Sequence, residues 1–114
     1  MNPFREENPG VPEQKLVDDY LWELNADRAR THFVTEVLRN YEAYLSQRVY
    51  LTEIVEANAL VIQGYIVGMA VRDSSIACMK QHVDVLSDFY DYLITQHEMD
   101  ENPAAGARLP DRED

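Results

Sequence analysis

The chain has 114 residues, of which 46% are hydrophobic and 27% are charged, a composition that fits one domain with a modest core. Its 21 acidic residues outnumber 10 basic ones, and the net charge of −11 argues against direct binding to nucleic acid or to an anionic membrane, since both require Lys and Arg. Cys78 is the only cysteine, which excludes an internal disulfide and indicates a reducing compartment.

The sequence contains no pattern typical of a targeting or membrane-spanning segment. Its N-terminal part lacks the apolar core of a secretory signal and carries acidic residues instead. The most apolar stretch, residues 59–71, contains Gln63 and is shorter than the roughly 20 apolar residues that a bilayer span needs. We therefore expect a cytoplasmic protein without membrane contact, in which residues 59–71 form a buried helix.

The distribution of proline predicts an all-α fold. No proline occurs between Pro12 and Pro103, so nothing of that kind interrupts a helix in this interval. Residues 1–11 contain two prolines and one glycine and are expected to form an irregular N-terminal arm. Residues 12–101 are expected to form a single helical domain, and residues 102–114 a flexible acidic tail.

The first predicted helix covers residues 12–24. Pro12 suits its first turn, because the N–H that proline lacks has no partner there. Trp22 lies beside Asp18 and Asp19 on the polar face of this helix. It is either an interface anchor or a residue covered by a neighbouring helix. The apolar face is predicted to contain Leu16, Val17, Tyr20, Leu21 and Leu24.

The second predicted helix is long and covers residues 27–72, with Asn25 or Asp27 as its cap. Its apolar residues follow alternating steps of four and three, the spacing of a coiled-coil seam. A helix of this length would span about 70 Å. A break near Asn58 or Gly64 stays open as an alternative, because long helices without caps are uncommon in compact domains.

A third helix is predicted from a cap at Asp73 or Ser74 to about residue 98. It would cover only about 37 Å of the long helix, so a second copy of the chain is expected to cover the rest. The sequence thus predicts a three-helix chain that forms an antiparallel helical bundle as a homodimer. The expected interface residues are Val55, Ala59, Ile62, Gly64, Ile66, Gly68 and Met69.

Gly64 and Gly68 lie one turn apart on the same helical face, and two interpretations are open. The missing side chains allow another helix to approach closely, or they make room for Tyr65 or Met69 inside the chain.

Acidic residues concentrate in the third predicted helix, since residues 73–101 carry seven acidic residues and one basic residue. Asp84, Asp88 and Asp91 share one face, and Glu98 follows one heptad later. Carboxylates one turn apart are separated by about 6 Å, which is close to the spacing of successive phosphates. This stripe is either a surface that binds a basic partner or an ordinary solvated face.

Catalytic and metal-binding motifs are missing from the sequence. Neither His82 nor His97 has an acidic residue three positions before it, as the Glu-x-x-His pairs of di-metal bundles require. Cys78 precedes His82 by one turn, but a cysteine packed in the core is the simpler interpretation. No glycine-rich phosphate loop, zinc spacing or nucleophile elbow is present. We therefore expect no cofactor, no metal site and no enzymatic activity.

These observations predict a non-enzymatic regulator or inhibitor that binds a basic surface on another protein, in the extreme case as a nucleic-acid mimic. A nucleic-acid-binding protein is one such partner. The alternative is a structural subunit or assembly adaptor that acts through helical oligomerisation. The predicted partner-binding residues are Asp84, Asp88, Asp91, Glu98, Trp22, Asp18 and Asp19.

Overall fold

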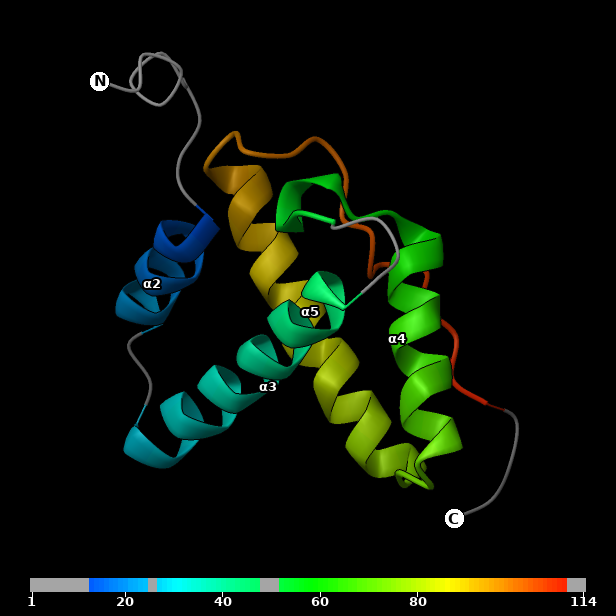
Figure 1. Cartoon of the computed structure of the whole chain (residues 1–114). Coiled ribbons are helices and arrows are strands. Elements are labelled where there is room, and N and C mark those ends of the chain that lie inside the picture. Colours follow the sequence, from blue (N-terminus) through cyan, green and yellow to red (C-terminus); the bar gives the residue numbers. More distant parts are fainter. Residues whose placement is uncertain (1–12, 25–26, 48–51, 111–114) are drawn as a thin grey trace.

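The computed structural model describes residues 13–24, 27–47 and 52–110, and within these ranges the chain contains four α-helices and no strand (Figure 1). The helices pack in an antiparallel arrangement, which confirms the prediction of an all-α helical bundle. Helix α2 covers Glu13–Glu23, α3 covers Arg28–Ser46, α4 covers Ala59–Val71 and α5 covers Ile76–Thr95. A short 3₁₀ turn, η1, covers Ile54–Glu56 and precedes α4.

Side-chain caps determine where three of these helices begin. Asp27 Oδ1 accepts a hydrogen bond from the Arg30 N–H at 2.7 Å, as the sequence predicts for the start of α3. Asn58 Oδ1 accepts from the Val61 N–H at 3.0 Å and begins α4. Ser75, one residue after the predicted positions, caps α5. Each oxygen satisfies an N–H group that the first turn of a helix leaves unpaired.

Both α4 and α5 end at a residue with left-handed backbone. Asp73 and His97 have φ values of 63°. After each of them, the next N–H donates to the carbonyl five positions earlier, at 3.0 and 2.9 Å, which is the pattern of a Schellman motif. Asp73 therefore belongs to the end of α4 and does not cap α5.

The long helix predicted over residues 27–72 is wrong, because the chain turns back between α3 and α4. The ring centroids of Tyr44 and Tyr65 lie 5.3 Å apart. In one continuous helix these two residues would be about 30 Å apart. The Tyr44 hydroxyl also donates to the Val61 carbonyl at 2.9 Å, which ties the end of α3 to the start of α4.

The break requires neither proline nor glycine. Glu53 and Glu56 form a reciprocal capping box around η1, in which the Glu53 N–H donates to Glu56 Oε1 at 2.9 Å. Asn58 then caps α4, so the break that the sequence left open at this residue is confirmed. The turn buries Ile62 and Ile66 in the chain's own core, and each side chain contributes about 1.5–3 kcal/mol on burial. This burial explains why the folded-back arrangement is preferred over one long helix.

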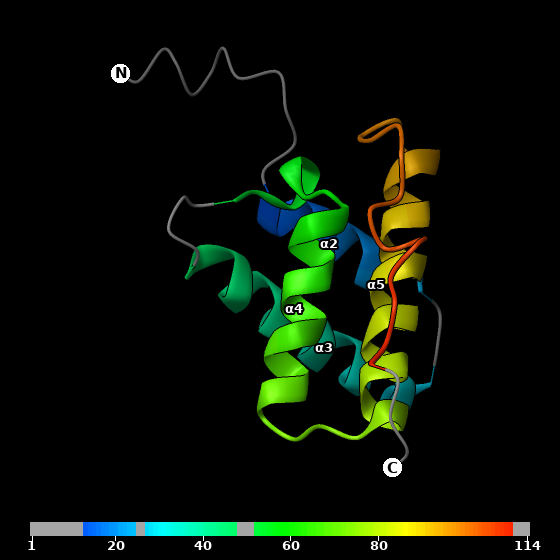
Figure 2. The same ribbon diagram turned by 90° about the vertical axis from the view of Figure 1, so that its right-hand side faces the viewer.

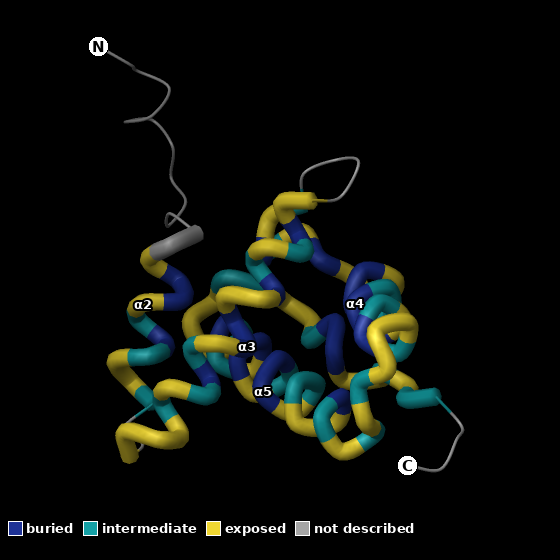
Figure 3. The backbone as a smooth tube through the Cα atoms, turned by 60° about the horizontal axis from the view of Figure 1, so that its bottom comes forward, coloured by how far each residue is buried: buried dark blue, intermediate teal, exposed yellow. Residues whose placement is uncertain are grey.

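Helix α5 is the centre of the fold. It contacts α2, α3 and α4 and runs antiparallel beside α4 (Figure 2). Figure 3 shows how the buried stretches of the chain face one another between the helices. The buried residues of α5 are Met79, Val85, Leu86, Phe89, Tyr90 and Leu93.

Two buried tyrosines connect α3, α5 and η1. The hydroxyl oxygens of Tyr41 and Tyr90 lie 2.7 Å apart, and the Tyr90 hydroxyl donates to the Ile54 carbonyl at 2.9 Å. Because the Tyr90 hydroxyl has one proton, Tyr41 is the donor in the shared hydrogen bond. Both rings are fully buried, so this short chain of hydrogen bonds fixes the position of η1 on the bundle.

The segment after α5 contacts the bundle over most of its length, whereas the sequence predicts a flexible tail from residue 102. Asn102 Nδ2 donates to Asp91 Oδ1 at 2.9 Å, and Ala104 is buried. Gln63 Nε2 donates to the Arg108 carbonyl at 2.8 Å, and the Arg108 N–H donates back to Gln63 Oε1 at 3.2 Å. The predicted arm and the last four residues lie outside the described ranges.

Candidate functional site

The residues predicted to bind a partner lie on two helices that pack together. Helix α2 contacts α5, and the Tyr20 ring lies 5.2 Å from both the Phe89 ring and the Tyr92 ring. The predicted contact residues of α2 are Asp18, Asp19 and Trp22, and those of α5 and the turn after it are Asp84, Asp88, Asp91 and Glu98.

Trp22 points into solvent. Its exposed fraction is 85%, so none of the described helices covers it and the alternative of burial is wrong. On a helix, residues three and four positions apart are neighbours, which places the indole beside Asp18 and Asp19. The only tryptophan of the chain therefore stands on a polar surface among carboxylates.

Carboxylates from α2 and from the turn after α5 lie near Tyr92. Burial raises the pKa of the Tyr92 phenol above 10.0, and the charges of Asp19, Glu23 and Glu98 raise it further, while Lys15 lowers it. A charge changes a pKa appreciably only at short range, so these three carboxylates lie near the same ring. The packing of α2 on α5 thus gathers acidic residues that are far apart in the sequence.

The pKa shifts of two further residues extend this surface. Burial raises the pKa of Tyr20, and the Asp88 carboxylate on α5 adds to the effect while Arg30 opposes it. Burial also raises the pKa of Glu42 on α3, where Arg39 opposes the effect and Asp18 adds to it.

We call this surface the α2 acidic face. Three bases, Lys15, Arg30 and Arg39, lie among these groups, and each opposes one of the pKa increases described above. Lys15 Nζ pairs with Asp19 Oδ2 at 3.0 Å in a solvent-exposed ion pair, which contributes little to stability. The residues of the α2 acidic face are Asp18, Asp19, Trp22, Glu23, Glu42, Asp88 and Glu98.

Two members of the predicted stripe on α5 are engaged within the chain. Asp84 Oδ2 lies 3.2 Å from Lys80 Nζ, and Asp91 Oδ1 accepts the hydrogen bond from Asn102. Asp88 is the member of the stripe whose charge reaches α2. The stripe is therefore divided between the α2 acidic face and local contacts.

Glu23 and Glu42 are not among the residues that the sequence predicts to bind a partner. Glu23 is one turn after Asp19 on α2, and that spacing could have identified it. Glu42 carries no such signal, because its place near Asp18 depends on the packing of α2 on α3.

The residues predicted as an oligomer interface lie largely inside one chain. Ile62, Ile66 and Met69 are buried in the core of the monomer, so they cannot form a surface for a second copy. Ala59 is exposed, and Val55 is half-buried against the core. The seam that suggested a dimer is covered by the chain itself once α4 folds back on α3.

One of the two glycines of α4 makes room for a side chain of the same chain. A Cβ atom at Gly64 would lie 2.5 Å from the Tyr44 hydroxyl oxygen, which is too close for an unchanged structure. A Cβ atom at Gly68 would lie 3.7 Å from Arg72 Nη1, an ordinary contact distance. Gly64 therefore admits Tyr44, a residue that the sequence analysis did not connect with it.

The outer face of α4 is apolar and open. Leu60, Val67 and Val71 are 81%, 53% and 78% exposed, and their spacing places them on one stripe of the helix. Beside this stripe, an apolar groove of about 410 Å³ lies between α4 and the segment that contains Leu109 and Pro110.

Within residues 13–24, 27–47 and 52–110, no group of three His, Cys, Asp or Glu side chains is placed to hold a metal ion. None of the described helices has the length and apolar character that crossing a membrane requires.

Comparison with known proteins provides no relative. No family model matches the chain, and neither curated proteins nor solved structures show a significant match.

Proposed function

We propose that this protein is a non-enzymatic regulator or inhibitor that binds a basic surface of a partner protein through the α2 acidic face. The observation that carries the proposal is the exposed indole of Trp22 among carboxylates. Tryptophan presents a large apolar area and is enriched among residues that dominate binding energy. An Arg side chain of the partner can stack on this ring and pair with a neighbouring carboxylate at once.

The carboxylates around Trp22 support a basic partner. Asp19 and Glu23 are one turn apart on α2 and, with Glu98, raise the pKa of Tyr92. Like charges at this helical spacing destabilise a fold by about 0.2–0.5 kcal/mol per pair. A basic surface would offset that repulsion, and its attraction would speed association at low salt. Since proteins that bind nucleic acid carry such surfaces, we favour them as the partner class.

Matched charge reversals test this proposal. The tagged wild-type chain, Asp88→Lys and Glu36→Lys are each used to capture proteins from the lysate of the source organism. Glu36 is an exposed residue of α3. It shares a helical face with Asn40 and Ala43, which lie four and seven residues later and line a cavity, and Glu42 lies on another face. Both variants change the net charge equally.

We expect wild type and Glu36→Lys to retain the same basic protein at low salt and to release it at high salt, because exposed charges are screened. Asp88→Lys should retain about tenfold less of it, since a repulsive charge then faces the basic surface. Equal retention by Asp88→Lys and Glu36→Lys would show that the α2 acidic face is not the binding surface.

The outer face of α4 favours a second candidate function, that of an assembly adaptor that associates with a second copy of itself. The stripe of Leu60, Val67 and Val71 leaves apolar area in water, and α4 carries no charged residue. Two copies with a net charge of −11 each can therefore meet at α4 with less repulsion than at other faces.

Sedimentation measurements test the adaptor proposal. Wild type should form a dimer, and Val67→Glu should be monomeric because it places a charge in the centre of the stripe. Gln81→Glu, at an exposed position of α5, is the control and should dimerise as wild type does. A monomeric wild-type chain at high protein concentration would exclude this function and leave the first proposal untouched.

A further inference from the structure

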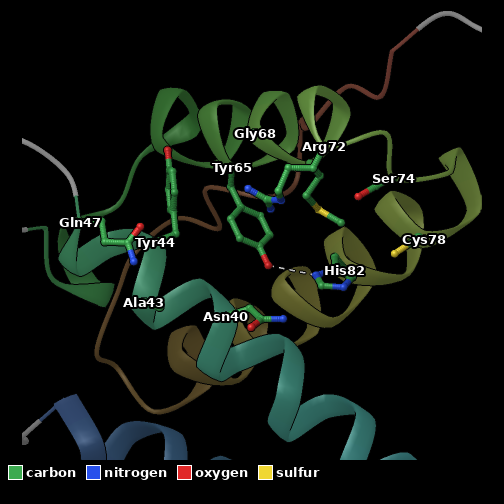
Figure 4. Close-up of a pocket in the computed structure, with 11 residues that line it drawn as sticks. Asn40, Ala43, Tyr44, Gln47, Tyr65, Gly68, Arg72, Ser74, Cys78 and His82 are labelled. Atoms are coloured by element: carbon green, nitrogen blue, oxygen red, sulfur yellow. Dashed lines mark hydrogen bonds between the residues drawn. The ribbon is translucent and has the colours of Figure 1, made fainter.

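A polar cavity of about 460 Å³ opens between α3, α4 and the first half of α5 (Figure 4). Pockets for small molecules have volumes of about 300–1,000 Å³ and combine apolar walls with a few polar groups. The rings of Tyr44 and Tyr65 provide the apolar walls here. The polar groups of the lining are Asn40, Gln47, Arg72, Ser74 and His82.

One wall of the cavity is fixed by a hydrogen bond between Tyr65 and His82. The Tyr65 hydroxyl oxygen lies 3.0 Å from His82 Nδ1. Burial, with a smaller effect of the Arg72 charge, lowers the pKa of His82 below 6.5. Burial raises the pKa of Tyr65 to about 12. Both side chains are therefore uncharged at neutral pH.

Arg72 is the charged residue of this lining. It follows α4, and its side chain folds back over Gly68, where Nη1 would be 3.7 Å from an added Cβ. Its charge lowers the pKa of both Tyr65 and His82, which places the guanidinium at the cavity wall. Figure 4 shows the side chain directed toward the Tyr65 ring.

The guanidinium of Arg72 has no anionic partner among the described residues. The ion pairs in this part of the chain are formed by other residues, and no described residue that lines the cavity is acidic. Acidic residues are twice as frequent as basic ones in this chain, so a cation at an acid-free cavity is an exception to the composition. A planar guanidinium binds a carboxylate through two parallel hydrogen bonds.

We propose that the cavity binds a small organic monocarboxylate, whose carboxylate pairs with Arg72 and whose apolar body packs against the wall formed by the contacting rings of Tyr44 and Tyr65. A single positive charge matches a single negative charge. A phosphate group carries about −1.5 to −2 at neutral pH and would bring excess charge into an acidic protein. This site is independent of the α2 acidic face and of the function proposed for it.

Sodium benzoate is a suitable probe, because it joins one carboxylate to one apolar ring. We expect it to shift the amide resonances of Gly68, Arg72 and His82 in the ¹⁵N-labelled full chain, along one saturable curve. Arg72→Gln should weaken binding about tenfold by removing the bidentate pair. Arg39→Gln, with the same charge change at an exposed position outside the lining, should bind as wild type does.

The titration of His82 gives a second readout in the same samples. A bound carboxylate adds a negative charge beside the imidazole, so benzoate should raise the pKa of His82 in wild type and not in Arg72→Gln. Arg72→Lys keeps the positive charge but cannot form the two parallel hydrogen bonds of a guanidinium, so it should bind benzoate with intermediate affinity. The proposal is overturned if benzoate produces no saturable shifts, if Arg72→Gln binds it as wild type does, or if inorganic phosphate binds as tightly as benzoate.

Discussion

The two sides of α5 hold their neighbours in different ways. On the side of α3 and η1, the buried pair of Tyr41 and Tyr90 forms directed hydrogen bonds. On the side of α2, Tyr20 packs against Phe89 and Tyr92 through ring contacts, and carboxylates lie near the Tyr92 ring. Directed, fully satisfied contacts specify one arrangement of helices, whereas crowded carboxylates oppose it.

This difference separates residues that determine the fold from residues that are available to a partner. The side of α3 and α4 contains the hydroxyl hydrogen bonds and the close approach at Gly64. The side of α2 contains Trp22 and like charges, neither of which the fold requires. Substitutions on the first side should therefore cost more stability than substitutions on the second.

The largest effect is expected at Tyr90. Tyr90→Phe removes two buried hydrogen bonds and should lower the free energy of unfolding by about 2–3 kcal/mol. Tyr92→Phe also removes a phenol hydroxyl, but on the α2 side, where the ring is only half-buried. It should change the free energy of unfolding by less than about 0.5 kcal/mol. Urea denaturation measures both, and equal losses would contradict the comparison.

A smaller effect is expected from the two glycines of α4. Alanine has a higher helix propensity than glycine by about 1 kcal/mol, so Gly68→Ala should stabilise the chain by up to that amount. Gly64→Ala gains the same propensity but displaces the Tyr44 hydroxyl from its hydrogen bond to Val61.

Gly64→Ala should therefore be less stable than Gly68→Ala by about 1–2 kcal/mol. Thermal or urea unfolding of the two variants, measured side by side, checks this difference. If both alanines stabilise the chain equally, Tyr44 does not need the space at Gly64.

His82 lies on the side of α3 and α4 and should make the free energy of unfolding depend on pH. Its pKa is lowered in the folded chain by burial and by Arg72, so the unfolded chain binds the proton more readily. The neutral, buried imidazole contributes fully to the free energy of unfolding above the unfolded pKa of 6.5, and this contribution is lost as the pH falls below that value.

His82→Gln removes the titrating group and should reduce the loss of stability between about pH 7.5 and about pH 5.5. Glu42, whose pKa is raised by burial, works in the opposite direction at lower pH and is present in both proteins. An identical pH profile in wild type and in His82→Gln would show that the imidazole is not buried against Arg72.

The smallest effect is expected at Glu23 on the α2 side, where the substitution should stabilise the chain. Glu23→Gln removes repulsion with Asp19, one turn earlier, and with the carboxylates near Tyr92. It should raise the free energy of unfolding by about 0.3 kcal/mol at low salt, and less at high salt. A loss of stability would mean that Glu23 makes a contact on which the fold depends.

Periodicity and capping residues predicted much of the fold. The apolar spacing of α2 identified Leu16, Val17 and Tyr20, which are buried, and Asp27 was recognised as a cap. The regular spacing continued through residues 52–58, and this concealed the turn between α3 and α4. Asn58 is a local signal that leaves a break open, whereas the capping box of Glu53 and Glu56 is obscured by the regular apolar seam.

The candidate sites were less predictable because they depend on tertiary packing. Asp18, Asp19 and Asp88 could be selected as acidic residues on helical faces, but nothing local places Glu42 beside Asp18. The cavity at Arg72 joins side chains from three helices, and it exists only because α4 folds back on α3.

The central claim is that the α2 side serves binding and not folding, and Trp22→Ala tests it most directly. The free energy of unfolding and the capture of the basic partner are measured on the same preparation of this variant. We predict a stability within about 0.5 kcal/mol of wild type, because the indole is 85% exposed, and at least about tenfold weaker capture. Unchanged capture, or a loss of stability as large as that of Tyr90→Phe, would contradict the claim.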